Sequence, residues 1–411
     1  MAEPASEPKP IVAPEWLNAS FFESILRTSE HDKNLRVTGV EATPVGKPGE
    51  YLASQPFRFT VDYESVKRDA GHAGTIKLVV KILPERGVIG GQGTLDQELF
   101  RTELKMYGEF LPKMQRVLDD GDRPVLLARC LHSAEKPQPV IVMEDLAPAG
   151  WRGHDLIESF AEAKPITVAI ARFHAASFYL SKNKTDFEGF QSDVFQRKDP
   201  VVEWMFGKNL KAFVDAMRTW EGCEQLVEPL ERTVEDCSER LHRIYCCHTP
   251  GRAYNVLNHG DFHSKNLLHR FNDENAIVES RFLDLQACCW SSPAIDLYYL
   301  LNTIVHYKVK ANHKDDLISM YHREFTATLK AIGYFGAVPT MLDLQTELLR
   351  NAYLDVLHVT CFLQFRFIDF SKVPPEKLAT GQIGNVGLEN EDYQTLVKQL
   401  LPGYLHKGVL E

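Results

Sequence analysis

The chain of 411 residues is longer than one hydrophobic core usually supports, so its length favours two domains. Hydrophobic residues make up 44% and charged residues 25%, which is typical of a globular protein and argues against extensive disorder. The formal net charge of −10 argues against nucleic acid as the main partner, because binding a phosphate backbone requires a basic surface.

The targeting and redox signals point to the cytoplasm. The first residues, MAEPASEPKP, have neither the basic nor the apolar segment of a signal peptide. The longest apolar stretch, residues 297–305, is too short to span a bilayer. The eight cysteines lack the spacing of a disulfide framework, and zinc-site spacing is absent from the loose group His242, Cys246, Cys247 and His248. We therefore expect no membrane contact and no obligate protein partner.

The N-terminal third predicts a small sheet with one main helix. Residues 1–14 hold four prolines and are expected to form a disordered tail. The N-terminal lobe is then predicted at 15–145. Its expected elements are a helix from about residue 15, strands at 35–43, 57–63 and 75–83, a helix at 94–110 closed by Pro112, and strands at 125–130 and 140–143.

The remainder, 146–411, predicts a larger and mostly helical lobe. Pro165 stands at a plausible helix start, since proline is favoured at the first helical position. Short strands are expected at 256–258, 267–269 and 281–284, and helices after them. The predicted fold class is α+β with two lobes.

The segment HGDFHSKN at 259–266, with FLDLQ at 282–286, carries the strongest local signal. Phosphoryl transfer from ATP requires Mg²⁺, which prefers hard oxygen ligands. Asn266 and Asp284 supply an amide and a carboxylate for that ion. Asp261 supplies a carboxylate that can accept or orient the proton of an attacking hydroxyl group. The alternative is an ordinary turn that uses Gly, Asp and Asn for their conformational freedom.

A cation for the phosphates is also predicted. Lys81 lies in the middle of an apolar strand, where a buried ammonium group requires an anionic partner. Glu103 lies four residues after Leu99 on the apolar stripe of the following helix. We expect these two charges to pair, as they do in kinases. Glu98 is the fallback partner, and the alternative is two side chains that reach water separately.

Two further segments are weaker candidates for nucleotide contacts. The turn at 46–54 could close over the phosphates, but it lacks the GxGxxG pattern and fits an ordinary hairpin loop as well. VIVMEDL at 140–146 could be a hinge that pairs with adenine through Met143, Glu144 and Leu146. A strand that merely connects the lobes fits this segment equally.

Three other polar residues are expected to be structural. Asp296 opens an apolar helix and is interpreted as a cap, with a possible second role in bracing the loop at 259–266. His174 is interpreted as a satisfied core histidine. His263 could touch a substrate, but an exposed loop side chain is the simpler interpretation.

These motifs together resemble the ecdysteroid kinase-like proteins of the choline/aminoglycoside kinase-like superfamily. HGDFHSKN, FLDLQ, SSPAIDLYYLL, VMEDL and FRTELKMY carry the resemblance, which extends over residues 35–410. It implies a protein-kinase-like fold with ATP between a β-rich and a helical lobe. It also implies Asp261 as the base, Asn266 and Asp284 as Mg²⁺ ligands, the Lys81–Glu103 pair, and a phosphate loop from Gly49 to Ser54.

Two spacings favour a small-molecule substrate. From Asp145 to Asp261 the sequence advances 261 − 145 = 116 positions, which is long enough to add a helical substrate pocket. From Asp284 to Asp296 it advances only 296 − 284 = 12, which leaves no room for the activation segment on which protein kinases hold a peptide. We therefore expect an ATP- and Mg²⁺-dependent kinase that phosphorylates a hydroxyl group of a small molecule.

The sequence leaves the acceptor and three rival functions open. The resemblance suggests an ecdysteroid or another lipophilic alcohol, and an apolar pocket could come from Tyr353, Leu357, Phe362, Phe365, Phe367 and Phe370, although these residues also fit a core. A choline- or ethanolamine-like alcohol is the competing acceptor. A pseudokinase that only binds ligands, a protein kinase and a phosphatase are the rival classes.

Overall fold

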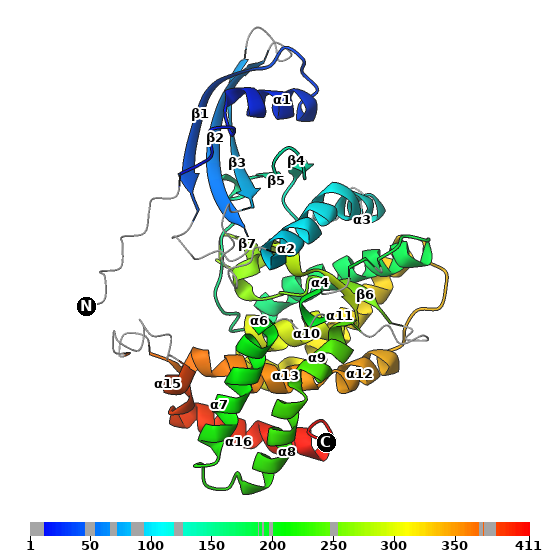
Figure 1. The fold of residues 1–411 in the computed structure, drawn as a ribbon. Coiled ribbons are helices and arrows are strands. Elements are labelled where there is room, and N and C mark those ends of the chain that lie inside the picture. The colour runs from blue at the N-terminus through cyan, green and yellow to red at the C-terminus, as the bar shows by residue number, and fades with distance from the viewer. Residues whose placement is uncertain are drawn as a thin grey trace, which may run out of the picture. The chain divides into compact units, whose positions relative to one another are not determined.

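The computed structural model describes residues 12–45, 54–65, 72–83, 94–118, 126–187, 189–190, 193–196, 200–246, 254–369, 373 and 384–411 (Figure 1). The chain divides into two compact units. The N-terminal unit comprises residues 1–152, 268–275 and 281–286, and the C-terminal unit comprises residues 153–267, 276–280 and 287–411.

The N-terminal unit is built on a five-stranded antiparallel sheet with the order β1-β2-β3-β5-β4. Its elements are α1 (Ala19–Ser29), β1 (Arg36–Pro44), β2 (Gln55–Ser65), β3 (His72–Ile82), α2 (Thr94–Lys105), the π-helical turn η1 (Met106–Phe110), α3 (Leu111–Leu118), β4 (Cys130–Ala134), β5 (Val140–Glu144) and the short 3-10 helix η2 (Ala147–Ala149). The hairpin of β7 (Leu267–Phe271) and β8 (Ile277–Phe282) contributes residues to both units.

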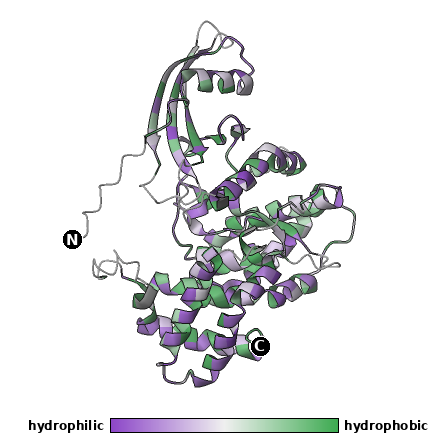
Figure 2. Ribbon diagram, in the orientation of Figure 1, coloured by the Kyte–Doolittle hydropathy of each residue, from purple (hydrophilic) through white to green (hydrophobic). Residues whose placement is uncertain are grey.

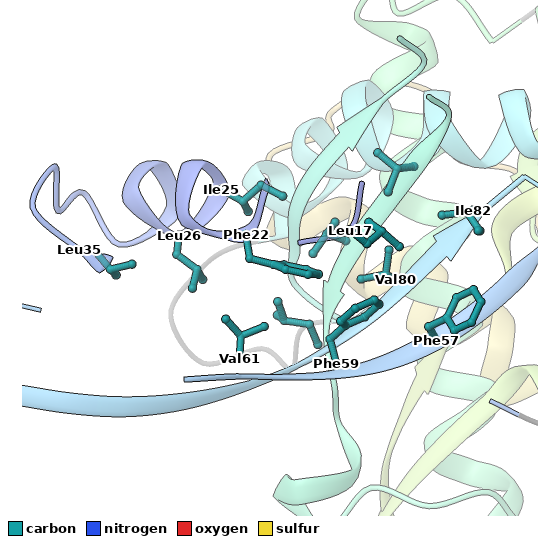
Figure 3. Close-up of a cluster of buried hydrophobic side chains, with 13 residues drawn as sticks. Leu17, Phe22, Ile25, Leu26, Leu35, Phe57, Phe59, Val61, Val80 and Ile82 are labelled. Atoms are coloured by element: carbon teal, nitrogen blue, oxygen red, sulfur yellow. The ribbon is translucent and has the colours of Figure 1, made fainter. Parts of the chain in front are cut away.

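Helix α1 packs on one face of the sheet, and the buried apolar side chains between the helix and the sheet form the core of this unit. Phe22 and Ile25 of the helix point at Phe59 and Val80 of β2 and β3 (Figure 3). The rings of Phe22 and Phe59 lie 4.8 Å apart. Burial of this apolar surface is the main driving force for the helix to dock on the sheet.

The alternation of side chains along β3 places a charge on the other face of the sheet. Leu78, Val80 and Ile82 are buried in the core under α1. Because successive side chains of a strand point to opposite faces, Lys81 is directed away from α1. The strand pattern therefore aims the predicted phosphate-binding lysine at the opposite side of the sheet.

The C-terminal unit is mostly helical, as predicted, and many of its helices alternate hydrophobic and hydrophilic residues (Figure 2). Its long helices α4 and α11 pack side by side, and β6 pairs with β9 in an antiparallel ladder. The elements are α4 (Phe160–Lys182), α5 (Asp193–Gln196), α6 (Pro200–Val202), η3 (Glu203–Gly207), α7 (Lys208–Met217), α8 (Glu224–Glu235), α9 (Cys237–Cys246), β6 (Val256–Asn258), η4 (Ser264–Asn266), β9 (Cys289–Ser291), α10 (Ala294–Tyr299), η6 (Leu300–Ile304), α11 (Tyr307–Ala331), α12 (Met341–Arg350), α13 (Tyr353–Leu357), η7 (His358–Phe362), η8 (Leu363–Phe367), α15 (Gly384–Leu388) and α16 (Glu391–His406). The short turn η5 (Leu285–Ala287) contributes residues to both units.

The predicted α+β fold class is confirmed, and several predicted boundaries are wrong. The first helix begins at Ala19 rather than near Glu15, because the Asn18 side chain accepts a hydrogen bond from Phe21 N (3.2 Å) and caps it there. The chain stays helical past Pro112 to Leu118. Proline is tolerated there because Pro112 falls in the first turn of α3, directly after η1.

Helix α4 begins at Phe160 rather than at Pro165. Ser159 Oγ accepts a hydrogen bond from Glu162 N (3.2 Å), and this cap starts the helix five residues earlier. Pro165 therefore lies inside α4, where it lacks one N–H donor near the helix start.

Two strand predictions are also displaced. The segment predicted at 125–130 is not a sheet strand over its described residues. Leu127 makes an isolated bridge with Phe282, and β4 starts only at Cys130. A short apolar run does not by itself specify a strand. The strand predicted at 281–284 is β8, which ends at Phe282, because Asp284 takes a left-handed conformation with φ of +62°.

None of the helices within the described ranges is both long and apolar enough to cross a membrane.

Candidate active site

Lys81 forms a buried charge cluster in the N-terminal unit. Its Nζ lies 2.7 Å from Glu103 Oε1 and 2.7 Å from Asp284 Oδ1. Glu103 is fully buried, and Lys81 is 8% exposed. The predicted Lys81–Glu103 ion pair is thus present, with Glu103 and not Glu98 as the partner. Asp284 joins it across 203 residues of sequence.

Local folding of the chain after β8 completes this cluster. The backbone N–H of Leu285 donates to Glu103 Oε1 (3.3 Å), and Gln286 Nε2 donates to Asp284 Oδ2 (3.2 Å). Asp284 has a positive φ, which costs a residue with a Cβ about 1–2 kcal/mol. Such strain is common at functional sites, where the surrounding contacts hold the residue in place.

The cluster holds one ammonium group between two carboxylates. Burial by itself lowers the pKa of Lys81, but the charges of Asp284 and Glu103 together outweigh burial and raise the pKa. Burial raises the pKa of Glu103, and the charge of Lys81 offsets this effect only in part. Lys81 is therefore firmly cationic, and the cluster is rich in negative charge.

Asp261, His263 and Asn266 come together in the C-terminal unit. Asn266 Nδ2 donates to the backbone carbonyl of Asp261 (2.9 Å) and lies 3.2 Å from Asp261 Oδ2. His263 Nε2 lies 3.4 Å from the same carboxylate oxygen. The single turn η4, whose cap is His263, holds the three residues together.

These neighbours keep Asp261 ionised. Burial raises the pKa of the Asp261 carboxyl group, but the hydrogen bond and charge of His263 and the hydrogen bond of Asn266 outweigh burial, so the pKa is lowered. An ionised carboxylate that is 32% exposed can accept a hydrogen bond from a hydroxyl group.

Asp296 braces the loop that carries Asp261. Its carboxylate is fully buried and accepts hydrogen bonds from His259 N (2.6 Å) and Gly260 N (3.0 Å). The Asp296 side chain does not cap its own helix α10. The bracing role is thus the observed one, and the interpretation as a simple cap is wrong.

Gly260 is required by the same loop. Its φ is +81°, and a Cβ at this position would lie 2.0 Å from the backbone oxygen of Ala287. No other residue type fits without displacing the backbone. The turn at Gly260 therefore fixes where Asp261 leaves strand β6.

His174 contacts the carboxylate of Asp296. Its Nε2 lies 3.0 Å from Asp296 Oδ2, and its Nδ1 lies 2.7 Å from the hydroxyl of Tyr321. His174 and Tyr321 are both fully buried. The expectation of a satisfied core histidine is confirmed, and the residue belongs to the support of the loop.

The weaker sequence candidates have mixed outcomes. Gly49 and most of the predicted phosphate loop lie outside the described residues, whereas Ser54 is described and buried. Glu144 N donates to Arg129 O (3.0 Å), and its carboxylate accepts from Arg129 N (2.8 Å). These groups of Glu144 are therefore already engaged. Met143 and Leu146 are buried at the end of β5 and just after it.

An aromatic cluster in the C-terminal unit includes two tyrosines that are within electrostatic range of Asp261. Tyr299 and Tyr245 both have their pKa raised by burial, and the charge of Asp261 adds to the effect on each. Tyr245 stacks on Phe195 with ring centroids 3.9 Å apart, and Tyr299 meets His358 edge-on at 4.7 Å. Further ring contacts join Phe195 to Phe206, Phe206 to Phe362, and Phe362 to His358. We define this aromatic cluster as Phe195, Phe206, Tyr245, Tyr299, His358 and Phe362.

Only one of the residues predicted to line an apolar pocket joins that cluster. Phe362 is a member, whereas Tyr353 and Leu357 are buried core residues. Phe367 contacts Tyr307 and Tyr393 instead. Phe370 lies outside the described residues.

Three contacts of the candidate site were not predicted from the sequence. His263 was expected to be an exposed loop residue, although the histidine lies against Asp261, and Gly260 and Gln286 had no expected role. The glycine directly before the aspartate was a usable signal, because glycine at a strand end often marks a positive φ. Nothing in the sequence marked the hydrogen bond from Gln286 to Asp284.

The predicted site residues thus form two groups. Lys81, Glu103 and Asp284 belong to the N-terminal unit, and Asp261 and Asn266 belong to the C-terminal unit.

Comparisons with known proteins agree with a kinase-like assignment. Residues 48–334 match the ecdysteroid kinase-like family. No curated protein sequence matches the chain.

The solved structures similar to the chain include three phosphotransferase complexes. One is a spectinomycin phosphotransferase with ADP and spectinomycin, with 11% identity, 91% of this chain and 98% of that chain covered, and a TM-score of 0.41. A GDP complex of an aminoglycoside 2'-phosphotransferase variant has 13% identity, coverage of 96% and 100%, and a TM-score of 0.39. A GDP and kanamycin complex of a further aminoglycoside phosphotransferase has 13% identity, coverage of 93% and 97%, and a TM-score of 0.39.

Proposed function

The chain belongs to the ecdysteroid kinase-like family, and from this premise we propose that it is an ATP- and Mg²⁺-dependent kinase. It transfers the γ-phosphoryl group of ATP to a hydroxyl group of a lipophilic small molecule such as an ecdysteroid. The proton of that hydroxyl passes to the Asp261 carboxylate as the new P–O bond forms, and ADP departs with the electrons of the broken bond.

The observation that carries this proposal is the cluster of Lys81, Glu103 and Asp284. A buried ammonium that two carboxylates hold in one position is suited to bind phosphate oxygens, because it needs no rearrangement to do so. Burying the ammonium group of Lys81 costs folding free energy, because a charge is removed from water. A role in nucleotide binding explains why the chain keeps it.

Asp284 and Asn266 each carry oxygen donors of the kind that suits a magnesium ion. Asp284 offers a carboxylate that is 23% exposed. Asn266 uses its Nδ2 for Asp261, and its Oδ1 accepts no hydrogen bond from any described residue. Carboxylate and amide oxygens are the ligands that Mg²⁺ prefers. We propose that Asn266 and Asp284 hold the ion, which when bound neutralises the charge of the phosphates.

Asp261 is proposed to act on the acceptor. Its lowered pKa keeps it ionised at neutral pH, so it can accept the hydrogen bond of the attacking hydroxyl and orient its oxygen. Asp296 and Gly260 fix the loop, and His263 lies against the carboxylate, so the orientation of Asp261 is set before the acceptor binds.

The aromatic cluster, two of whose tyrosines are within electrostatic range of Asp261, supports a lipophilic acceptor. Tyr299, Phe195 and Phe362 are only partly buried, so their rings retain apolar surface for a ligand. Aromatic side chains offer large contact areas to rings and hydrocarbon skeletons. Around the proposed base, this composition favours an alcohol with an extended apolar body over a small polar sugar.

An acceptor screen tests the proposal. The protein is incubated with Mg-ATP and a panel of ecdysteroids, sterols, choline and ethanolamine, and mass spectrometry follows the gain of one phosphoryl group. We expect an ecdysteroid or another lipophilic alcohol to be phosphorylated. Asp261→Asn should lower the turnover by about 10²–10⁴-fold, the usual contribution of a general base. The exposed Asp273→Asn, in the turn between β7 and β8, is the matched control and should retain full activity.

Nucleotide binding is measured separately by thermal shift. Mg-ATP at about 100 times its Kd should add roughly 2.7 kcal/mol of apparent stability to both the wild type and Asp261→Asn. Binding without phosphorylation of any acceptor would favour the pseudokinase alternative. A choline product alone would overturn the lipophilic acceptor, and no shift at millimolar Mg-ATP would overturn the kinase assignment itself.

A further inference from the structure

A cavity whose lining does not include Asp261 lies in the C-terminal unit. It has a volume of about 400 Å³ and lies between η6, the first turns of α11, the α13–η8 region and α16. This volume is within the range of small-molecule sites, which is roughly 300–1,000 Å³.

Helix turn η6 separates this cavity from the catalytic loop. Thr303 donates a hydrogen bond to Phe262 O, and Tyr299, one turn earlier, lies near Asp261. Leu301, Asn302 and Val305 line the cavity instead. Residues two or three positions apart on a helix point in different directions, so the cavity is on another side of this segment from the proposed base.

One side of the cavity is apolar. Leu396 and Leu400, one turn apart on α16, both line it and are only partly buried by the protein itself. Buried side chains of η6, η7 and η8 complete this side, including Val305 and Val359. An apolar ligand segment placed here would cover leucine surface that the fold leaves exposed.

The polar side of the cavity is basic. Lys310 is held by Asp355 (2.6 Å) and Asn302 (2.7 Å), so its charge is already matched. Lys314 and Lys407 also line the cavity, and no carboxylate of the described residues lies within 4 Å of either.

The remaining carboxylates cancel this charge only in part. Asp315 and Asp316 line the rim but are exposed, and Asp316 pairs with His313 (3.0 Å). Both Lys314 and Lys407 act on the pKa of Lys310, which places the three ammonium groups within electrostatic range of one another. Asp315 alone is left opposite half-buried Lys314 and exposed Lys407, so the unpaired groups of the lining include one ammonium group more than carboxylates.

We propose that this cavity is a second ligand site, distinct from the acceptor site, that binds an amphiphilic anion with its apolar chain against α16 and its head group at Lys314 and Lys407. A carboxylate and a phosphate monoester share this chemistry, so the head group is tested with both.

Calorimetric titration of the full-length protein without nucleotide tests the site. The probes are octanoate and octyl phosphate, with 1-octanol and octyltrimethylammonium as uncharged and cationic controls of the same chain length. We expect saturable binding of at least one anion with a stoichiometry of one, and the tighter of the two identifies the head group. The double variant Lys314→Gln/Lys407→Gln should weaken binding at least tenfold, and Leu400→Gln should also weaken it.

A matched double variant controls for loss of lysine charge in general. Lys330→Gln/Lys398→Gln removes one lysine from each of the same two helices outside the cavity and should leave the affinity unchanged. Because Lys314 and Lys407 make no ion pair with a described residue, their replacement should leave the unfolding temperature unchanged. Absence of saturable binding, equal affinity in the Lys314→Gln/Lys407→Gln variant, or binding of octanol or the cation as tight as that of the anions would overturn the proposal.

Discussion

Lys81 shows how a single residue can have both a structural and a chemical role. Near the end of β3 it lies between the buried side chains of Val80 and Ile82, yet it carries a charge. Glu103 and Asp284 make this burial tolerable, since each places a carboxylate oxygen 2.7 Å from the ammonium group. Removing the lysine would leave two carboxylates in the same pocket.

The first prediction follows from that imbalance. Lys81→Met should destabilise the protein by about 3–5 kcal/mol, the usual effect of removing one partner from a buried ion pair. Urea unfolding measures it. Lys113→Met is the control, because Lys113 forms an exposed pair with Glu109 (2.8 Å), and such pairs contribute about 0–1 kcal/mol. Equal losses in the two variants would contradict the role assigned to burial.

A second prediction at the residue scale concerns pH. Burial lowers the pKa of His358 from 6.5 to about 4. Between pH 6.5 and 4, His358 is therefore protonated in the unfolded chain but neutral in the folded chain. Because the unfolded state binds the extra proton, His358 makes the protein less stable as the pH falls through this window. The full effect is about 3 kcal/mol from the linkage between pKa and stability.

The free energy of unfolding is measured at pH 7 and near pH 4 in the wild type and in His358→Gln. On acidification, the free energy of unfolding of the wild type should fall by up to about 3 kcal/mol more than that of the variant. His313→Gln, at an exposed histidine on α11, should behave as the wild type. Identical acid losses in the wild type and His358→Gln would show that His358 titrates normally.

At the scale of elements, the turn from β6 into η4 depends on two devices. Asp296 at the start of α10 accepts both backbone N–H groups of the turn, and Gly260 supplies the positive φ. The turn is thus held by an element 36 residues away in sequence as well as by its own glycine.

The third prediction separates the conformational and steric roles of Gly260. Gly260→Ala should destabilise the protein and abolish turnover, because the new Cβ would collide with the Ala287 carbonyl. Gly333→Ala is a matched control with φ of +79° and no atom within 4 Å of an added Cβ, so it should cost only about 1–2 kcal/mol. Thermal unfolding and turnover measure both. A Gly260→Ala protein as active as Gly333→Ala would show that the loop is free to move.

At the scale of the whole molecule, the proposed function requires residues from both units. The phosphate-binding cluster belongs to the N-terminal unit, and the proposed base and Asn266 belong to the C-terminal unit. A ligand bound by both should rigidify segments of each.

The fourth prediction is therefore that Mg-ATP slows amide hydrogen exchange in two places. We expect protection around β3 and α2 in one unit and around residues 261–267 in the other, since bound ligand suppresses local opening. ATP with a chelator is the control and should protect residues 261–267 less, because Asn266 is proposed to act through the metal. Protection confined to β3 and α2 would contradict the proposed role of Asn266.

The sequence by itself determined the fold class and predicted the residues of the candidate site. The pattern of Asp261, Asn266 and Asp284 and the charge inside strand β3 are local features, because they follow from residue type and from the two-residue period of a strand. The same local logic predicted the partner Glu103 from its place on a helical stripe. Element boundaries were less well predicted, since side-chain caps such as Asn18 and Ser159 start the helices where periodicity alone does not.

Only the tertiary structure decided the long-range contacts. Asp284 joins Lys81 across 203 residues, and Asp296 reaches back to the Gly260 turn. The aromatic cluster and the basic cavity are likewise assembled from helices far apart in sequence. A single sequence carries the periodicity of each element but not the pairing between elements, because pairing depends on how the whole set of apolar faces is buried at once.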